Sequence, residues 1–145
     1  MIRTCASCGA KNRVPARHLS DTGRCGCCKA ALPPVSEPIE ADAALFGDVV
    51  REAKVPILVD FWAAWCGPCR AAAPEVHALA HEVAGRALVL KVDTEAHPEV
   101  AARFGVQSIP NFVVLRNGKT VLQQAGLVGR SQMRSWLERA SAVSA

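Results

Sequence analysis

Residues 55–69 read Val-Pro-Ile-Leu-Val-Asp-Phe-Trp-Ala-Ala-Trp-Cys-Gly-Pro-Cys, an apolar run followed by two cysteines three residues apart. The run from Val55 to Trp62 predicts a buried strand, and the pattern after Cys69 predicts a helix. Thiols with this spacing at a helix start lie on one face, close enough to form a disulfide. The helix N-terminus also favours a thiolate on Cys66. A C-x-x-C in this setting predicts a dithiol redox site.

Length and composition limit the possible classes of protein. The chain has 145 residues, half of them hydrophobic, which allows one ordinary domain and a small appendage. No apolar run approaches the roughly 20 residues of a membrane span, so we expect no membrane association. Residues 1–5 lack the apolar segment of a secretory signal, so we expect a cytoplasmic protein. In a reducing compartment the seven cysteines favour metal binding or catalysis over structural disulfides.

Residues 1–32 hold five of the seven cysteines and few large apolar side chains, so this segment cannot fold unaided. Four of the cysteines follow C-x2-C-x16-C-x2-C, the spacing of a four-cysteine zinc site. Zinc bound by four thiolates would supply most of the folding energy. The predicted ligands are Cys5, Cys8, Cys25 and Cys28. A reducing cytoplasm disfavours the alternative that these cysteines form two disulfides. An iron site remains open, because the cysteine spacing alone also fits iron.

Two further features of this segment leave alternatives open. Cys27 adjoins the predicted ligands, and it is either a reactive free thiol or a small inert side chain. The segment is also basic, which is a property of nucleic-acid-binding fingers. It is short and has no aromatic residue, so we expect no nucleic-acid partner.

The rest of the chain predicts an α/β fold. Residues 33–40 are rich in proline and predict a linker, and residues 41–145 alternate helical and strand patterns. We expect helices over 43–54, 70–84 with a break at Pro74, 98–105 and 131–140, and strands over 55–61, 87–92, 111–115 and 120–124. Asn117-Gly118 predicts a hairpin between the last two strands. This order predicts a mixed central sheet flanked by helices.

Several motifs in residues 41–140 occur together. They are Asp60 to Arg70, Pro74, Lys91 to Asp93, Ile109-Pro110, Asn117-Gly118 and Gly126. With these motifs the segment resembles the thioredoxin family, and the cysteine-rich extension resembles that of the zinc-finger thioredoxins of bacteria. Cys27 departs from that pattern. The resemblance implies a thioredoxin fold after the linker, over 41–145, and a four-cysteine zinc ribbon before it, over 1–32.

Four residues are the candidate catalytic groups. Cys66 is predicted to be the nucleophile, because it has the helix N-terminus and solvent access, and Cys69, one turn deeper, is predicted to resolve the mixed disulfide. Asp60 interrupts an apolar strand, so burial should raise its pKa and suit it to accept the proton of Cys69. The resemblance implies that Lys91 approaches Asp60 and tunes it. A surface lysine at a strand end is the competing interpretation.

The expected substrate surface is an apolar patch beside the two cysteines. The resemblance implies a cis bond between Ile109 and Pro110, with the Ile109 backbone next to Cys66 and ready to pair with a substrate strand. Such a patch suits extended segments of varied proteins. Its predicted residues are Trp65, Gly67, Pro68, Ile109, Pro110, Gly126 and Leu127.

We therefore predict a monomeric, cytoplasmic protein-disulfide reductase with one structural zinc ion and no bound organic cofactor. The resemblance implies disulfide-containing protein substrates and a thioredoxin reductase that supplies electrons, its flavin and NADPH belonging to that partner. The dipeptide Gly67-Pro68 resembles that of reductase-type thioredoxins. One alternative is a zinc-ribbon binding module or holdase chaperone on a thioredoxin scaffold. Another is an oxidase or isomerase of cysteines.

Overall fold

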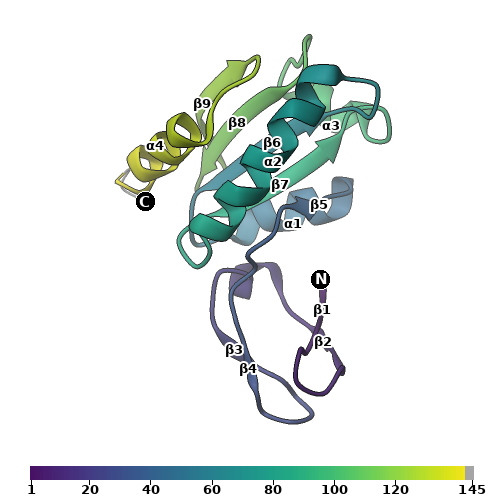
Figure 1. Ribbon diagram of the computed structural model, residues 1–145, viewed down its shortest axis with the longest axis vertical. Helices are drawn as coiled ribbons and strands as arrows, with labels where there is room; N and C mark the ends of the chain where they lie inside the picture. Colours follow the sequence, from purple (N-terminus) through teal and green to yellow (C-terminus); the bar gives the residue numbers. More distant parts are fainter. Residues whose placement is uncertain (143–145) are drawn as a thin grey trace.

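The computed structural model describes residues 1–142, which form a smaller N-terminal part and a larger part (Figure 1). The larger part is a five-stranded sheet with helices on both faces. The smaller part consists of two short hairpins. Among the described residues, no helix combines the length and the apolar character that crossing a bilayer requires.

The larger sheet is mixed, as the sequence predicts. Its strand order is β5-β7-β6-β8-β9. The first three of these strands run parallel to one another. Strand β8 pairs antiparallel with β6, and β9 pairs antiparallel with β8. The strands are β5 (Ile39–Glu40), β6 (Ile57–Trp62), β7 (Leu88–Asp93), β8 (Asn111–Arg116) and β9 (Lys119–Ala125). The turn from β8 to β9 uses Asn117 and Gly118, both with positive φ, as expected for this dipeptide.

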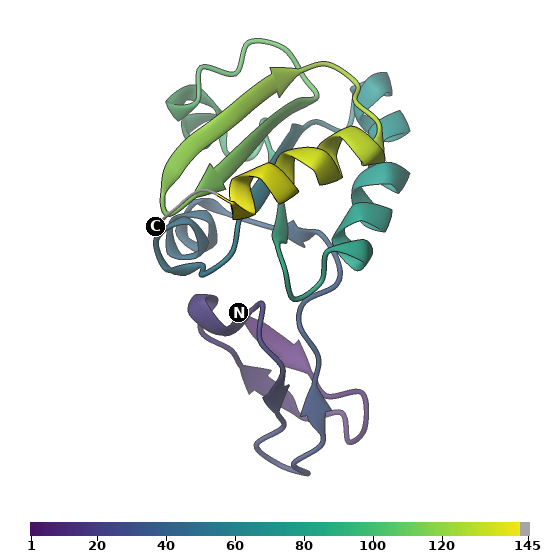
Figure 2. The same ribbon diagram turned by 90° about the vertical axis from the view of Figure 1, so that its left-hand side faces the viewer.

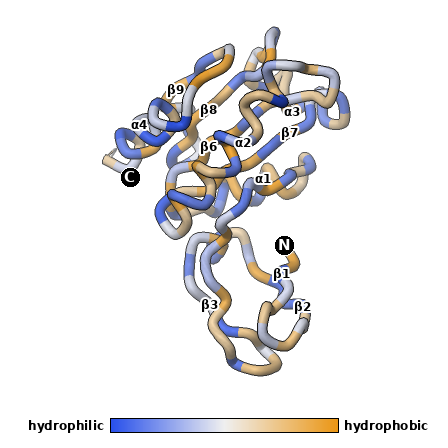
Figure 3. The backbone as a smooth tube through the Cα atoms, viewed as in Figure 1, coloured by the Kyte–Doolittle hydropathy of each residue, from blue (hydrophilic) through white to orange (hydrophobic). Residues whose placement is uncertain are grey.

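The described chain contains four α-helices, and they cover the two faces of the sheet in pairs (Figure 2). They are α1 (Ala43–Glu52), α2 (Gly67–Glu82), α3 (Pro98–Arg103) and α4 (Arg130–Ser141). Helices α1 and α3 share one apolar core with the sheet, and α2 and α4 share the other. The central strands β6, β7 and β8 are mostly buried and apolar, and Figure 3 shows the hydrophobic colour along β8. Asp60, in the middle of β6, interrupts this pattern.

Helix α2 differs from the predicted helix at its start and at Pro74. It begins at Gly67, inside the C-x-x-C motif, and Cys66 is its N-cap. It continues through Pro74 without a break. Pro74 lacks an N–H and removes one bond to the preceding turn, but the buried residues on either side, Ala72 and Val76, hold the helix on the sheet.

The smaller part contains strands that the sequence analysis did not predict. They are β1 (Ile2–Thr4), β2 (Lys11–Arg13), β3 (Gly23–Arg24) and β4 (Ala31–Leu32), and a 3-10 helix, η1 (Ala16–His18), lies between the hairpins. Strands of two or three residues are too short to show a periodic pattern. The apolar cluster of this part contains Cys5, Cys25 and Leu32. We call this part, residues 1–32, the ribbon.

The segment that we predicted as a linker, residues 33–40, is fixed at both ends. Val35 is buried, and its N–H donates to the Leu19 carbonyl at 3.0 Å. Ile39 and Glu40 form β5, the edge strand of the larger sheet. The sheet therefore begins before residue 41, because the last two residues of this segment pair with β7.

The ribbon also contributes to the core beneath α1. Leu19 is fully buried and belongs to the same apolar cluster as Phe46 and Val49 of α1. Beside it, Lys54 Nζ lies 2.6 Å from Asp21 Oδ2. The segment that follows η1 is thus packed on the larger part, although the hairpins of the ribbon extend away from it (Figure 1).

We expect Leu19→Ala to lower the free energy of unfolding by about 3 kcal/mol, because it opens a cavity in this shared core. Urea denaturation followed by tryptophan fluorescence measures the effect, since all three tryptophans lie in the larger part. Leu127→Ala is the control: Leu127 is 58% exposed, so its change should stay within about 0.5 kcal/mol. A similarly small change for Leu19→Ala would show that the larger part folds without the ribbon.

Candidate active site and metal centre

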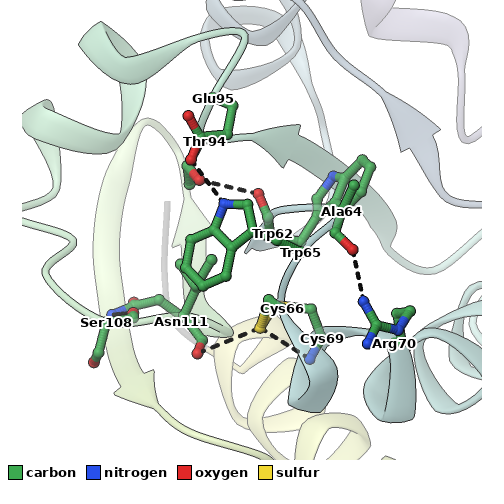
Figure 4. Close-up of a disulfide and its surroundings, with 11 residues drawn as sticks. Trp62, Ala64, Trp65, Cys66, Cys69, Arg70, Thr94, Glu95, Ser108 and Asn111 are labelled. Carbon is green, nitrogen blue, oxygen red and sulfur yellow. Dashed lines mark hydrogen bonds between the residues drawn. A yellow bond between two sulfur atoms is a disulfide. The ribbon is translucent and has the colours of Figure 1, made fainter.

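The C-x-x-C motif lies where β6 passes into α2. After Trp62 the chain turns, with the Cys66 N–H donating to the Ala63 carbonyl at 3.2 Å. Cys66 and Cys69 form a disulfide, with their Cα atoms 5.2 Å apart (Figure 4). This pair is the only disulfide within the described residues, and five further cysteines are free.

Both cysteines of this pair are buried in the disulfide form. Cys66 is 3% exposed and Cys69 is 5% exposed, so the greater solvent access that we expected for Cys66 is absent in this state. Trp62, Ala63 and Ile109 pack around the pair. What distinguishes Cys66 is its position before the first turn of α2, where its Sγ accepts the Cys69 N–H at 3.2 Å. The free N–H groups and dipole of the helix stabilise negative charge on that sulfur.

Asp60 is the buried carboxyl group of this site. It is 1% exposed, and burial raises its pKa to about 7, with the Lys91 ammonium lowering that pKa and the Glu40 carboxylate raising it. Its Oδ1 has no hydrogen-bond partner among the described residues. A buried carboxyl oxygen without a partner destabilises a fold, and groups with pKa values shifted by burial are concentrated at functional sites.

Lys91 lies beside Asp60 in the sheet but makes its ion pair elsewhere. The two residues are paired in register across β6 and β7. The Lys91 ammonium lies 3.9 Å from Glu40 Oε1 and 4.7 Å from the centre of the Trp62 ring. Among the described residues, Glu40 is the only carboxylate within 4 Å of it. Sequence analysis missed Glu40, because a two-residue edge strand gives no periodic signal and only the sheet register brings it beside Lys91.

The predicted substrate residues gather around the disulfide. The Ile109–Pro110 bond is cis, and the Ile109 carbonyl oxygen lies 3.7 Å from Cys66 Sγ. Gly67 and Pro68 are exposed in the first turn of α2. Trp65 is 67% exposed, and its Nε1 donates to Glu95 at 2.8 Å.

The outer part of this surface is hollowed on two sides. Gly126 donates its N–H to the Pro110 carbonyl at 2.9 Å, and Leu127 follows it in an exposed position. A hollow of about 530 Å³ beside Trp65 is lined by Ile109 and by residues that the sequence did not indicate, Thr94, Pro98, Ala101, Ala102, Val106, Gln107 and Ser108. A second hollow, of about 460 Å³, lies beside Leu127. Both hollows have room for side chains.

The four predicted metal ligands come together in the ribbon. The Sγ atoms of Cys5, Cys8, Cys25 and Cys28 all lie within 4.8 Å of one another. The Cys5–Cys28 and Cys8–Cys25 sulfur distances are both 3.7 Å. A tetrahedral zinc ion with Zn–S bonds of about 2.3 Å separates its sulfurs by about 3.8 Å. The cluster therefore has the donors and the spacing that a four-thiolate metal site requires.

Two similar turns, which we call knuckles, hold these sulfurs. The Cys5 N–H donates to the Ala10 carbonyl, and the Cys25 N–H donates to the Ala30 carbonyl. Asn12 Nδ2 donates to Cys25 Sγ at 3.5 Å, which supports one ligand from outside the cluster. Cys27 is exposed and is not part of the four-cysteine cluster, although its N–H donates to Cys25 Sγ at 3.4 Å.

Comparisons with known proteins agree with both parts of the chain. The sequence model of the thioredoxin family matches residues 37–139, and the one described as "Thioredoxin 2, N-terminal" matches residues 4–30. Thioredoxin C-3 of Corynebacterium nephridii is 40% identical over 139 residues, covering 96% of this chain and 94% of that protein. Thioredoxin of Haemophilus influenzae is 37% identical over 105 residues, covering 72% of this chain and 98% of that protein.

Solved structures show the same relationship. A mutant thioredoxin from Halobacterium salinarum NRC-1 superposes with a TM-score of 0.68 at 28% identity, covering 76% of this chain and 96% of that one. These matches agree with the disulfide at the start of α2 and with the cysteine cluster of the ribbon. The chain therefore belongs to the thioredoxin family, carries the N-terminal ribbon of the thioredoxin 2 type, and is a dithiol oxidoreductase.

Proposed function

We propose that this chain reduces disulfides of other proteins in the cytoplasm. The observation that carries the proposal is the Cys66–Cys69 pair at the start of α2, next to an exposed apolar surface. The Cys66 thiolate attacks a substrate disulfide, and the substrate's second sulfur leaves as a thiolate. Cys69 then attacks Cys66 Sγ, which breaks the mixed disulfide and closes the Cys66–Cys69 disulfide. Two electrons pass to the substrate, whose two sulfurs leave as thiols.

Asp60 accepts the proton of Cys69 in the second step. The support is its burial in β6, which raises its pKa to about 7, so that the carboxyl group is partly ionised at neutral pH. A base whose pKa lies near the working pH is the most effective acceptor. Lys91 tunes this group through its positive charge.

Substrates approach as extended segments with apolar side chains. The Ile109 backbone beside Cys66 offers hydrogen-bonding groups to such a segment, and the hollow beside Trp65 accommodates a side chain. The other contact residues in this proposal are Gly67, Pro68, Pro110, Gly126 and Leu127. The chain acts as a monomer and is reduced again by a thioredoxin reductase, which provides the flavin and uses NADPH.

An insulin-reduction assay with thioredoxin reductase and NADPH tests this function. NADPH consumption that depends on this chain and on a disulfide substrate supports the proposal. Reduction driven by dithiothreitol but not by the reductase would reject that partner. Protection of unfolded proteins by the Cys66→Ser protein, without disulfide reduction by the unaltered chain, would instead favour a holdase.

The ribbon cluster binds one structural zinc ion in this proposal. Its four sulfurs lie within 4.8 Å of one another, close enough for one metal ion, and the cluster around them is too small to fold without a metal. We expect one zinc per chain in the unaltered protein and none in Cys25→Ser, measured by elemental analysis. Cys27→Ser is the matched control and should retain one zinc, since Cys27 lies outside the cluster. Stoichiometric iron in the freshly purified protein would contradict the choice of zinc.

A further inference from the structure

Three ionisable side chains form a row across three neighbouring strands. Glu40 of β5 pairs in register with Lys91 of β7, and Lys91 pairs in register with Asp60 of β6. Residues paired in this way stand on the same face of a sheet. Leu58 and Val89, two residues before Asp60 and Lys91, pack in the core beneath α2 and α4, so the row lies on that face.

The contacts within the row favour Glu40 as the partner of Lys91. The Lys91 ammonium lies 3.9 Å from Glu40 Oε1, and its side chain is 18% exposed, whereas that of Glu40 is 61% exposed. Asp60 has no ion pair within 4 Å among the described residues, and its Oδ1 has no hydrogen-bond partner there. Lys91 therefore stands between an exposed carboxylate that it contacts and a buried one that it does not.

The other charged groups around the row are few. Asp93, further along β7, acts on Glu40 by repulsion. Arg3 and Glu37 line the same hollow of about 510 Å³ as Glu40. On the opposite side, β8 places Phe112 beside Asp60 and so adds no charge. Lys91 and Glu40 are thus the charged groups that act on Asp60.

We propose that Glu40 is a positioning residue of the redox site, which draws the Lys91 ammonium toward solvent and so limits how strongly that ammonium stabilises the charged form of Asp60. The proposal rests on the proposed function only in that Asp60 is the proton acceptor there. Burial raises the pKa of Glu40 above its usual value, and the Lys91 ammonium and the Trp62 side chain oppose that shift only in part. The Glu40 charge also repels Asp60 directly and acts in the same direction.

Removing the Glu40 charge should therefore lower the pKa of Asp60. In Glu40→Gln, Lys91 has no competing carboxylate and the direct repulsion is gone, so the charged form of Asp60 becomes more stable. Charges two strands apart, about 10 Å, act weakly through a partly solvated surface, so we expect the pKa of Asp60 to fall by about half a pH unit. NMR titration of the Asp60 carboxyl carbon in the full-length, zinc-loaded chain measures this change.

Two comparisons make the test specific. Glu37→Gln removes an exposed carboxylate from the same hollow, and the titration of Asp60 should not change. In a Lys91→Met background the effect of Glu40→Gln should shrink, because only direct repulsion remains. An Asp60 titration that does not move in Glu40→Gln, or an equal shift with and without Lys91, would overturn the proposal.

The pH dependence of the second chemical step distinguishes this proposal from the proposed function. The rate of mixed-disulfide resolution falls at low pH if Asp60 accepts the proton, because protonated Asp60 cannot act as a base. In Glu40→Gln the midpoint of this fall should move to lower pH together with the Asp60 titration. If the pKa of Asp60 falls but the pH dependence of the resolution rate does not change, the role of Glu40 is supported and Asp60 is rejected as the proton acceptor.

Discussion

Replacing Cys66 by serine is expected to abolish disulfide reduction, whereas replacing Cys69 by serine should stop the reaction halfway. Cys66 Sγ is the N-cap sulfur that accepts the Cys69 N–H, so the helix stabilises its thiolate and it attacks first. A hydroxyl group at position 66 cannot make this attack at neutral pH. Without the Cys69 thiol, the mixed disulfide between Cys66 and the substrate has no internal thiol to release it.

Turnover assays and mass spectrometry measure the two outcomes. The Cys66→Ser protein should show no turnover and no adduct, and the Cys69→Ser protein should accumulate one substrate adduct per chain. Cys27→Ser is the control, because Cys27 is exposed in the ribbon and should leave turnover unchanged. Normal turnover by Cys69→Ser would contradict its assignment as the resolving thiol.

Asp60→Asn is expected to stabilise the protein at alkaline pH and to slow the second step of the reaction. Burial raises the pKa of Asp60 from 3.8 to about 7, so between these values the folded state holds a proton that the unfolded state has released. Stability therefore falls as pH rises from about 4 to about 7 and is constant above. This pKa shift corresponds to a decrease in the free energy of unfolding on the order of 4 kcal/mol. The asparagine variant has no such decrease, because its side chain does not ionise.

Urea denaturation at several pH values measures this prediction. The variant and the unaltered chain should have similar stability near pH 4, where Asp60 is protonated in both states, and the variant should be the more stable one above about pH 7. Glu37→Gln, at an exposed site, is the control and should show no such pH-dependent gain. We also expect resolution of the mixed disulfide to slow by roughly 100-fold in Asp60→Asn at neutral pH. An unchanged rate would reject the role of Asp60 as a base.

The parts of the fold that sequence predicts best are those with long or distinctive patterns. The apolar run of β6 predicts a central buried strand, and its single charged residue marks Asp60 as a buried group. The cysteine spacing predicts which four sulfurs of the ribbon meet, because two C-x-x-C turns can converge in few ways. The catalytic and substrate-binding roles of the redox-site residues stay predictions that the variants above test.

What sequence did not predict depends on short elements and on contacts distant in the chain. Strand β5 has two residues, so Glu40 looked like part of a linker until sheet pairing brought it beside Lys91. Leu19 stands alone among polar residues, and nothing local indicates that it completes the core beneath α1. Pro74 predicted a break in α2, but tertiary packing of its neighbours on the sheet outweighed the missing hydrogen bond.

The length of α2 separates the two sets of thiols in this molecule. Its 16 residues span about 24 Å, with Cys66 at one end. Gly85, just past the other end, faces Pro34 at the base of the ribbon. The ribbon and the disulfide consequently lie at opposite ends of the molecule (Figure 1). Sulfur exchange requires the sulfur atoms to touch, so ribbon thiols and the Cys66–Cys69 disulfide of one molecule cannot react with each other. Any exchange between them is a collision of two molecules, with a second-order rate that vanishes on dilution.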